Sequence, residues 1–345
     1  MDLIHPHDAG TVAEALRDAS AAGTTVLPVG GRRHLDKGNP AEVDAELWTT
    51  RLDGIEAYDP AEMLAVVRAG TRAGELRAEL EAHGQEWPVD LPEDATVGGA
   101  IAAGVATPRQ LRVGLLRDTV VEMQVATGDG RLVTSGARTV KNVTGFDVHR
   151  LLTGSLGTLG VITRVALKLR PLPQRSSSLI AHDGGLDLGT RLLEEVPLPA
   201  AILAEPDRIV VRLEGWGPEV EDQITAARAV VALDDADDPF PEPLFPDAPI
   251  VAEVAVPPSR LAAALEGRDA WRAMLGVGLA WVPADDPDDL AALRAKVGDV
   301  GGIAPVIRGS GGLGEANVPA PDVQRRIKAA LDPAGILAPG RAWSS

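Results

Sequence analysis

The stretch from Asp94 to Pro173 constrains this chain most, because its glycines fall in blocks. The first block, Thr96 to Gly104 (TVGGAIAAG), is dominated by residues with small side chains or none, which lets the backbone approach a ligand closely. Backbone amides in such a segment can cradle an anion. A later block, Gly154 to Gly160 (GSLGTLG), joins a short helical piece to an expected strand at Val161 to Leu169. These blocks indicate a site that wraps around a large phosphate-bearing cofactor.

A second glycine segment lies near the start of the chain. Apolar residues at helical spacing predict a helix from Thr11 to Ala22, which Gly23 is placed to end. The strand expected next, Thr24 to Val29, runs directly into Gly30 to Gly38 (GGRRHLDKG). Successive amides at such a strand-to-loop junction can wrap a pyrophosphate, although an ordinary glycine turn has the same sequence signature.

The segments between these blocks predict a mixture of strands and helices. Strands are expected at Ile55 to Tyr58 and Leu64 to Ala69, and a helix at Arg72 to His83. An alternating segment, Val120 to Thr127, is followed by a Gly-Asp-Gly turn and Arg131 to Ser135, which predicts a hairpin.

The spacing of the glycines excludes two common nucleotide sites. No Gly-x-Gly-x-x-Gly motif lies between a strand and a helix, and the series Gly154, Gly157 and Gly160 has the wrong spacing for one. The phosphate-binding lysine loop of the NTPases is also missing from the sequence. The glycine segments therefore do not argue for NAD or ATP.

Charge and residue content narrow the function classes further. The chain has 345 residues and a formal net charge of −17, which repels nucleic acid and anionic membranes. It has no cysteine, which excludes disulfides, thiolate catalysis and cysteine-ligated iron–sulfur clusters from this chain. We find no secretory signal and no apolar run of about 20 residues, so we expect a cytoplasmic protein without direct membrane insertion. Acidic clusters at 234–238 and 285–289 are interpreted as solvated loops, and no metal site is expected.

Three blocks, in order, resemble a known family: Thr96 to Gly99 (TVGG), residues 140–147 (VKNVTGFD) and residues 154–163 (GSLGTLGVIT). They resemble the flavin-binding domain of the vanillyl-alcohol oxidase and p-cresol methylhydroxylase (PCMH) superfamily, and within it the FAD-binding subunits of bacterial glycolate oxidases. The resemblance implies FAD as the cofactor. It also implies an α+β fold, with a PCMH-type FAD-binding domain of two subdomains followed by a smaller ferredoxin-like α+β cap.

A change in amino-acid composition indicates where these domains divide. Prolines and serines follow one another from Pro171 to Ser178, and such a run is typical of a boundary. Beyond it, short strands and helices alternate, as a ferredoxin-like cap requires. We therefore expect an FAD-binding domain at 1–173 with subdomains at about 1–90 and 91–173, a cap domain at 174–330, and a tail at 331–345 that returns to the FAD-binding domain.

The resemblance also implies which residues hold the cofactor. Arg32 and Arg33 stand where relatives have a small residue and a hydroxyl, so each guanidinium either contacts phosphate or points into solvent. A valine at Gly98 or Gly99 is expected to take the space of the pyrophosphate while the fold is retained. The expected cofactor-binding residues are Val29, Gly30, Gly31, Arg32, Arg33, His34, Asp94, Thr96, Val97, Gly98, Gly99, Ala102, Ala103, Gly104, Arg117, Asp118, Lys141, Asn142, Gly145, Gly157, Gly160, Ile162 and Arg341.

The positions of the histidines bear on whether FAD is covalently attached and on which residue could act as the catalytic base. In histidine-linked relatives the histidine directly follows the glycine pair, whereas two arginines precede His34 here, so we expect noncovalent FAD. Relatives that oxidise hydroxy acids carry histidines late in the cap, but the last of the six histidines here is His182. We therefore assign no catalytic residue.

The resemblance implies an FAD-binding subunit of a glycolate-oxidase-like complex. A catalytic flavoprotein subunit and an iron–sulfur subunit would be its partners, and a small 2-hydroxy acid would be the substrate of the complex. Two alternatives stay open. One is a structural flavin-fold subunit that does not turn over, and the other is a stand-alone sugar or alditol oxidase.

Overall fold

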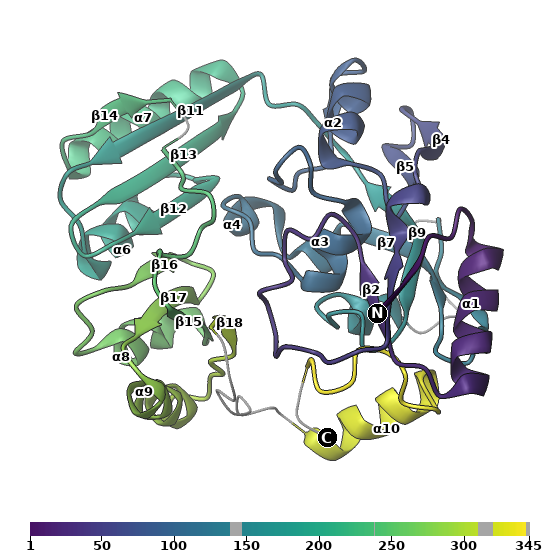
Figure 1. Cartoon of the computed structure of the whole chain (residues 1–345). Helices are drawn as coiled ribbons and strands as arrows, with labels where there is room; N and C mark the ends of the chain where they lie inside the picture. Colours follow the sequence, from purple (N-terminus) through teal and green to yellow (C-terminus); the bar gives the residue numbers. More distant parts are fainter. Residues whose placement is uncertain (139–146, 238, 310–319, 343–345) are drawn as a thin grey trace. The chain divides into compact units, whose positions relative to one another are not determined.

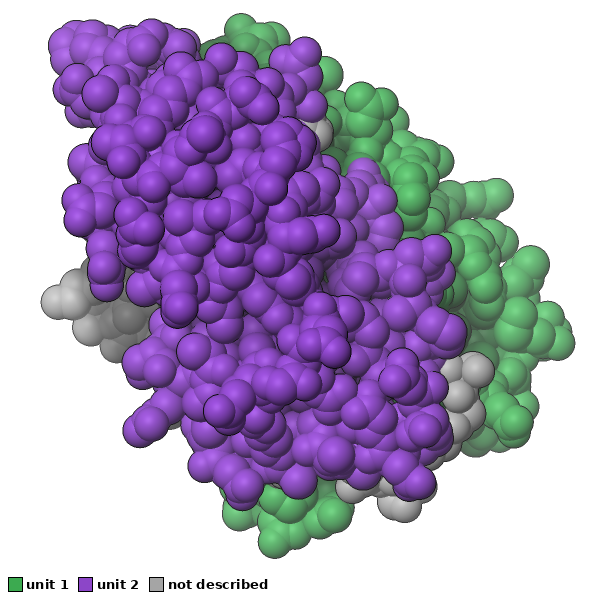
Figure 2. All heavy atoms as spheres, turned by 90° about the vertical axis from the view of Figure 1, so that its left-hand side faces the viewer, with its two compact units in different colours: residues 1–106, 115–172, 319–345 green, residues 107–114, 173–318 purple. Residues whose placement is uncertain are grey.

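The computed structural model describes residues 1–138, 147–237, 239–309 and 320–342. The chain divides into two compact units (Figure 2). Unit 1 contains residues 1–106, 115–172 and 319–345, and unit 2 contains residues 107–114 and 173–318. Within the described ranges, no helix is both long and apolar enough to cross a membrane.

Unit 1 begins with a small parallel sheet and one helix. The sheet has the order β1 (Asp2–Ile4), β3 (Ala45–Trp48), β2 (Val26–Val29), and α1 (Ala9–Ala22) leads into β2 (Figure 1). Asp8 caps α1 by accepting from the Thr11 amide, and Gly23 ends it in the left-handed conformation. The helix and strand expected here are confirmed within two residues of each end.

The larger sheet of unit 1 is antiparallel and has five strands. Its order is β4 (Ile55–Asp59), β5 (Leu64–Arg68), β9 (Val161–Lys168), β7 (Val120–Ala126), β8 (Leu132–Gly136). The expected hairpin is confirmed, because β7 pairs with β8 in antiparallel register. A subdomain boundary was expected near residue 90, and β5 pairs with β9 along its whole length. Strands on both sides of residue 90 therefore belong to one sheet.

Helices cover the five-stranded sheet and form the main core of unit 1. Its apolar residues come from the sheet strands and from α2 (Ala73–Glu81) and α3 (Val97–Ala103). Gly104 ends α3 in the left-handed conformation, with φ of 59°. The other short elements are η1 (Thr49–Arg51), β6 (Gln85–Glu86) paired with β10 (Arg170–Pro171), η2 (Leu116–Asp118) and α5 (His149–Leu152).

The carboxy-terminal segment belongs to unit 1. Helix α10 (Pro321–Leu331) was expected in the cap, but it lies in unit 1 together with the tail (Figure 1, yellow). Leu337 forms a parallel bridge with Val26 of β2. The ammonium of Lys328 donates to the carboxylate of Asp332 and to the carbonyl oxygens of Thr158 and Leu337. Because these contacts bind α10 to the tail and to the loop before β9, α10 cannot be counted with the cap.

Unit 2 is built from two consecutive β-α-β-β-α-β motifs that share one eight-stranded sheet. The sheet order is β14-β11-β13-β12-β16-β17-β15-β18. When the four strands of each motif are numbered in chain order, this gives 4-1-3-2 for the first motif and 2-3-1-4 for the second. The expected ferredoxin-like character is thus confirmed and occurs twice. The first motif contains β11 (Arg175–Ala181), α6 (Leu186–Glu195), β12 (Ala201–Ala204), β13 (Ile209–Gly215), α7 (Gly217–Val230) and β14 (Asp234–Ala236). The second contains β15 (Ile250–Ala255), η3 (Pro258–Arg260), α8 (Leu261–Leu265), β16 (Arg272–Met274), β17 (Leu279–Ala284), α9 (Pro287–Asp299) and β18 (Val306–Arg308).

A short segment, residues 107–114, leaves unit 1 and packs with unit 2. It contains α4 (Gln110–Val113). Arg109 lies 3.6 Å from the carboxylate of Glu214, and both side chains are 9% exposed. Arg112 donates to the carbonyl oxygen of Leu198. These contacts explain why a segment that sequence position assigns to the FAD-binding domain is part of unit 2.

Candidate functional site

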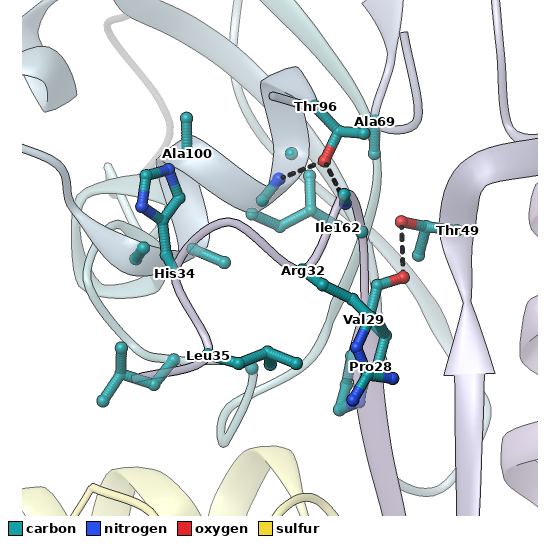
Figure 3. Close-up of a pocket in the computed structure, with 18 of the residues that line it drawn as sticks. Pro28, Val29, Arg32, His34, Leu35, Thr49, Ala69, Thr96, Ala100 and Ile162 are labelled. Carbon is teal, nitrogen blue, oxygen red and sulfur yellow. Dashed lines mark hydrogen bonds between the residues drawn. The ribbon is translucent and has the colours of Figure 1, made fainter. Parts of the chain in front are cut away.

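One pocket in unit 1 lies where the two glycine segments meet (Figure 3). Its walls come from the end of β2 and the following loop, from α3, and from the loop that enters β9. The open space between these segments is about 680 Å³, including the part that is open to solvent. The lining residues are Pro28, Val29, Gly30, Gly31, Arg32, Arg33, His34, Leu35, Thr49, Ala69, Thr96, Gly98, Gly99, Ala100, Ala102, Ala103, Leu156, Gly157, Gly160, Val161, Ile162 and Arg341.

The structure brings most of the residues expected from the sequence to this pocket. Asp94, Val97, Gly104, Arg117 and Asp118 were also expected at the site, but they do not line it. The Val97 side chain is fully buried in the core, and the carboxylate of Asp118 pairs with Arg150 instead. The remaining expected residues, Lys141, Asn142 and Gly145, lie outside the described residues.

Several lining residues were missed by sequence reasoning: Pro28, Leu35, Thr49, Ala69, Ala100, Leu156 and Val161. Ala100 and Leu156 lie inside the glycine blocks, so the blocks themselves were a signal for them. Thr49 and Ala69 carried no such signal, because they reach the pocket only through strand pairing. The Thr49 hydroxyl donates to the Val29 carbonyl oxygen at 3.2 Å, which holds it beside the first glycine loop.

Gly30 and Gly31 allow the two glycine segments to touch. A Cβ atom at Gly30 would lie 2.3 Å from the Thr96 hydroxyl oxygen, and one at Gly31 would lie 2.8 Å from the Asp94 carbonyl oxygen. Neither distance is compatible with a side chain. The Gly31 amide donates to the Thr96 hydroxyl oxygen at 3.3 Å, so this amide is already engaged within the protein. The lack of side chains at Gly30 and Gly31 therefore lets the loop after β2 pack closely against the Asp94–Thr96 segment.

Gly98 is a packing glycine, which corrects the expectation made for it. A Cβ atom there would lie 2.6 Å from the Cβ of Ala69 and 2.9 Å from the Ala69 carbonyl oxygen. At Gly99 it would lie 2.7 Å from the hydroxyl of Thr96, which caps α3. A valine at Gly98 would thus collide with Ala69, directly after β5, before it reached any ligand, and we expect it to disturb the fold.

The two arginines of the first loop pair with carboxylates, and 49% of the Arg32 side chain and 46% of the Arg33 side chain stay exposed. Arg32 donates through Nη1 to both carboxylate oxygens of Glu46, each at 3.0 Å. Arg33 donates through Nε to the carboxylate of Asp94 at 2.7 and 2.9 Å. This hydrogen bond from Arg33 lowers the pKa of Asp94 below its usual value.

His34 lines the pocket as a neutral ring. Burial, followed by the positive charges of Lys37 and Arg33, lowers its pKa to about 4. Its Nε2 atom is buried and has no hydrogen-bond partner among the described residues. The imidazole therefore brings no positive charge to the pocket near neutral pH.

Arg341 brings the tail to the pocket from the opposite end of the sequence. It is 5% exposed, and Nη2 donates to the Leu35 carbonyl oxygen at 2.9 Å. In return the Asn39 amide donates to the Arg341 carbonyl oxygen at 2.8 Å. Arg341 thus lines the pocket, and its guanidinium donates to the backbone of the first glycine loop.

The loop before β9 closes the remaining wall. Gly157 has φ of 78° and lies against the Pro28 ring, where a Cβ would be 3.2 Å from the nearest ring carbon. Gly160 faces Val125, with only 2.3 Å between a Cβ and the nearest side-chain atom. The Leu156 amide donates to the Ala102 carbonyl oxygen at 2.8 Å, which joins this loop to the end of α3.

Comparison with known proteins agrees with this architecture. A model of the FAD binding domain matches residues 3–136, and one of the C-terminal domain of FAD linked oxidases matches residues 315–342. Among solved structures, alkyldihydroxyacetonephosphate synthase has the same fold, with a TM-score of 0.69 at 18% identity over 98% of this chain and 75% of that chain.

Two curated relatives are glycolate oxidase subunits, and the first of them carries the family assignment. Glycolate oxidase subunit GlcE of Escherichia coli is 31% identical over 307 residues, which cover 84% of this chain and 85% of that protein. Glycolate oxidase subunit GlcD of Bacillus subtilis is 26% identical over 218 residues, which cover 61% of this chain but only 46% of that protein. This chain therefore belongs to the FAD-linked oxidases, a family of FAD-dependent oxidoreductases with a PCMH-type FAD-binding domain that includes the glycolate oxidase subunits.

Proposed function

We propose that this chain is the FAD-binding subunit of a glycolate-oxidase-like complex, in which it holds FAD without a covalent bond. The observation that carries the proposal is the similarity to GlcE, which extends over 84% of this chain and 85% of that subunit. A small 2-hydroxy acid is the proposed substrate of the complex, and the cytoplasm is its proposed location.

The residues of the pocket fit the cofactor. FAD needs an anchored pyrophosphate and an apolar slot that excludes water, and when bound it supplies an acceptor for the two electrons of the substrate. The pocket offers glycine backbone from two segments, together with apolar walls from Pro28, Leu156 and Ile162. The proposed FAD contacts are therefore the sequence-expected residues that line the pocket, apart from Arg32, whose guanidinium is held by Glu46. Lys141, Asn142 and Gly145 stay predictions for the region near the flavin ring.

Noncovalent binding is supported by the sequence around His34. In histidine-linked relatives the histidine directly follows the glycine pair, whereas Arg32 and Arg33 separate His34 from Gly31 here. We expect acid precipitation of the purified protein to release FAD into the supernatant. Yellow colour that stays in the pellet would contradict the noncovalent part, and a protein that cannot be loaded with FAD would contradict the proposal as a whole.

A separate catalytic subunit is proposed because the sequence has no histidine after His182, so the cap offers no late histidine to act as the base. His149 is buried and hydrogen-bonded to Ser135, and His182 is exposed beside Asp234 in unit 2. A missing general base typically lowers the rate by about 10² to 10⁴. An iron–sulfur subunit is proposed as the second partner, because a chain without cysteine holds no thiolate-bound cluster to pass electrons onward.

Activity measurements on the isolated and assembled protein test the proposal. The FAD-loaded chain alone should oxidise glycolate or lactate poorly, whereas co-expression with a catalytic flavoprotein subunit and an iron–sulfur subunit should give a stable complex and restore turnover. Oxidation by the isolated chain at the rate of the complex would instead favour a stand-alone oxidase. FAD binding without restored turnover in any assembly would favour the second candidate, a structural subunit, which the engagement of Arg32, Arg33 and the Gly31 amide within the protein supports.

A further inference from the structure

Arg32 adopts a backbone conformation that an arginine rarely takes. Its φ angle is 60°, in the left-handed region where a residue with a Cβ atom is strained. The two glycines before it have no positive φ, and they serve the approach to Thr96 and Asp94. The left-handed turn at the start of this loop is thus made by Arg32, while the loop ends at Gly38 with φ of 90°. Such strain persists only where the surroundings hold the residue in place.

The surroundings of Arg32 provide that hold. Glu46 and Trp48 are two residues apart on β3, so their side chains lie on the same face of the strand. The Glu46 side chain is 5% exposed, and it accepts from Arg32 at 3.0 Å and from the Trp48 indole at 2.9 Å. The Arg32 guanidinium also lies 5.3 Å from the centre of the Trp48 ring, within range of a cation–π contact.

These contacts draw the side chain away from the inner wall of the pocket. In Figure 3 the Arg32 side chain extends back along β2 toward Pro28, away from Thr96 and Ala100. Removing the guanidinium would leave the Glu46 carboxylate buried without a cation, which is strongly unfavourable. The ion pair therefore resists any exchange of Arg32 from Glu46 to a ligand phosphate.

We infer that Arg32 is a positioning residue: anchored by Glu46 and Trp48, it fixes the left-handed turn that shapes the cofactor loop, and it does not itself contact the cofactor. This inference rests on the proposal that the pocket holds FAD. It predicts that a glycine can replace Arg32 in function while an alanine cannot, because glycine adopts a positive φ without strain.

Two double variants that differ by one methyl group test the inference. Arg32→Gly/Glu46→Gln and Arg32→Ala/Glu46→Gln both remove the ion pair, and the glutamine keeps an acceptor for the Trp48 indole. FAD affinity, measured by titration calorimetry, should be about five- to thirtyfold weaker for the alanine variant than for the glycine variant. Raising the salt concentration should affect the wild type and the glycine variant equally. Equal losses in the two variants, or a salt dependence present only in the wild type, would assign Arg32 to direct phosphate contact and overturn the inference.

A measurement without FAD separates this inference from the proposed function. In urea denaturation of the FAD-free proteins, the alanine variant should be less stable than the glycine variant, since the strain belongs to the loop itself. Equal stability would overturn the inference even where FAD binds normally. If the wild type binds no FAD, the proposed function fails, and the urea comparison still decides whether Arg32 fixes the turn.

Discussion

The hydroxyl oxygen of Thr96 accepts a hydrogen bond from the Gly31 amide at 3.3 Å, across 65 residues of sequence. The same oxygen accepts from the Gly99 amide at 3.3 Å and so caps α3. Thr96 is 3% exposed. A single buried side chain therefore joins the two glycine segments that line the pocket.

Replacing Thr96 by valine should weaken both the fold and the pocket. Valine has nearly the same shape but no acceptor, so the helix cap is lost, at a cost of about 1 kcal/mol, and the partly buried Gly31 amide is left without this partner. We expect a lower urea midpoint together with weaker FAD binding. Thr96→Ser keeps the acceptor and is the matched control. Wild-type FAD affinity in the valine variant would show that this junction does not shape the site.

Replacing Gly98 by alanine should destabilise the protein whether or not FAD is present. The new methyl group would overlap Ala69, which directly follows β5, and overpacking of this kind costs about 1–3 kcal/mol. Gly217 begins α7 with open space around it, so Gly217→Ala should change the free energy of unfolding by less than about 0.5 kcal/mol. Urea denaturation of the FAD-free proteins compares them. An unchanged midpoint with lost FAD binding would restore Gly98 to a purely cofactor-facing role.

Replacing Lys328 by methionine should detach the tail from the loop before β9. The Lys328 ammonium lies 2.5 Å from the carboxylate of Asp332, whose side chain is 0% exposed, and breaking a buried pair typically costs about 3–5 kcal/mol. The exposed pair between Arg325 and Asp322 on the same helix is the control, and Arg325→Met should change stability by less than about 1 kcal/mol. Thermal unfolding measures both variants. Equal effects would mean that burial of the Lys328 pair contributes nothing to the attachment of α10.

The pKa of His34 predicts a loss of stability in mild acid. The unfolded chain binds a proton on this ring below pH 6.5, whereas the folded protein does so only below about pH 4. The unfolded state therefore holds up to one more proton between these values, so His34 makes stability fall as the pH drops through this window. Without FAD, the free energy of unfolding of the wild type should fall by up to about 2 kcal/mol more than that of His34→Asn between pH 7 and pH 5. Parallel losses in the two proteins would show that His34 does not titrate in this way.

The sequence by itself determined the features that depend on neighbouring residues. The helix that Gly23 ends and the hairpin of β7 and β8 were predictable, because their caps, turn and periodicity act over a few residues. The glycine blocks indicated the walls of the pocket for the same reason, since their small residues stand together in the sequence.

Only the tertiary structure decided which distant residues meet. The pairing of β5 with β9, the attachment of α10 to unit 1 and the doubling of the ferredoxin-like motif depend on strand register across long separations, on which local periodicity carries no information. The carboxylate partners of Arg32 and Arg33 also could not be predicted from the local sequence. A glycine-rich loop with two arginines predicts a phosphate site from its composition, but Glu46 and Asp94 reach those guanidiniums only once the sheet and the loop before α3 have folded around them.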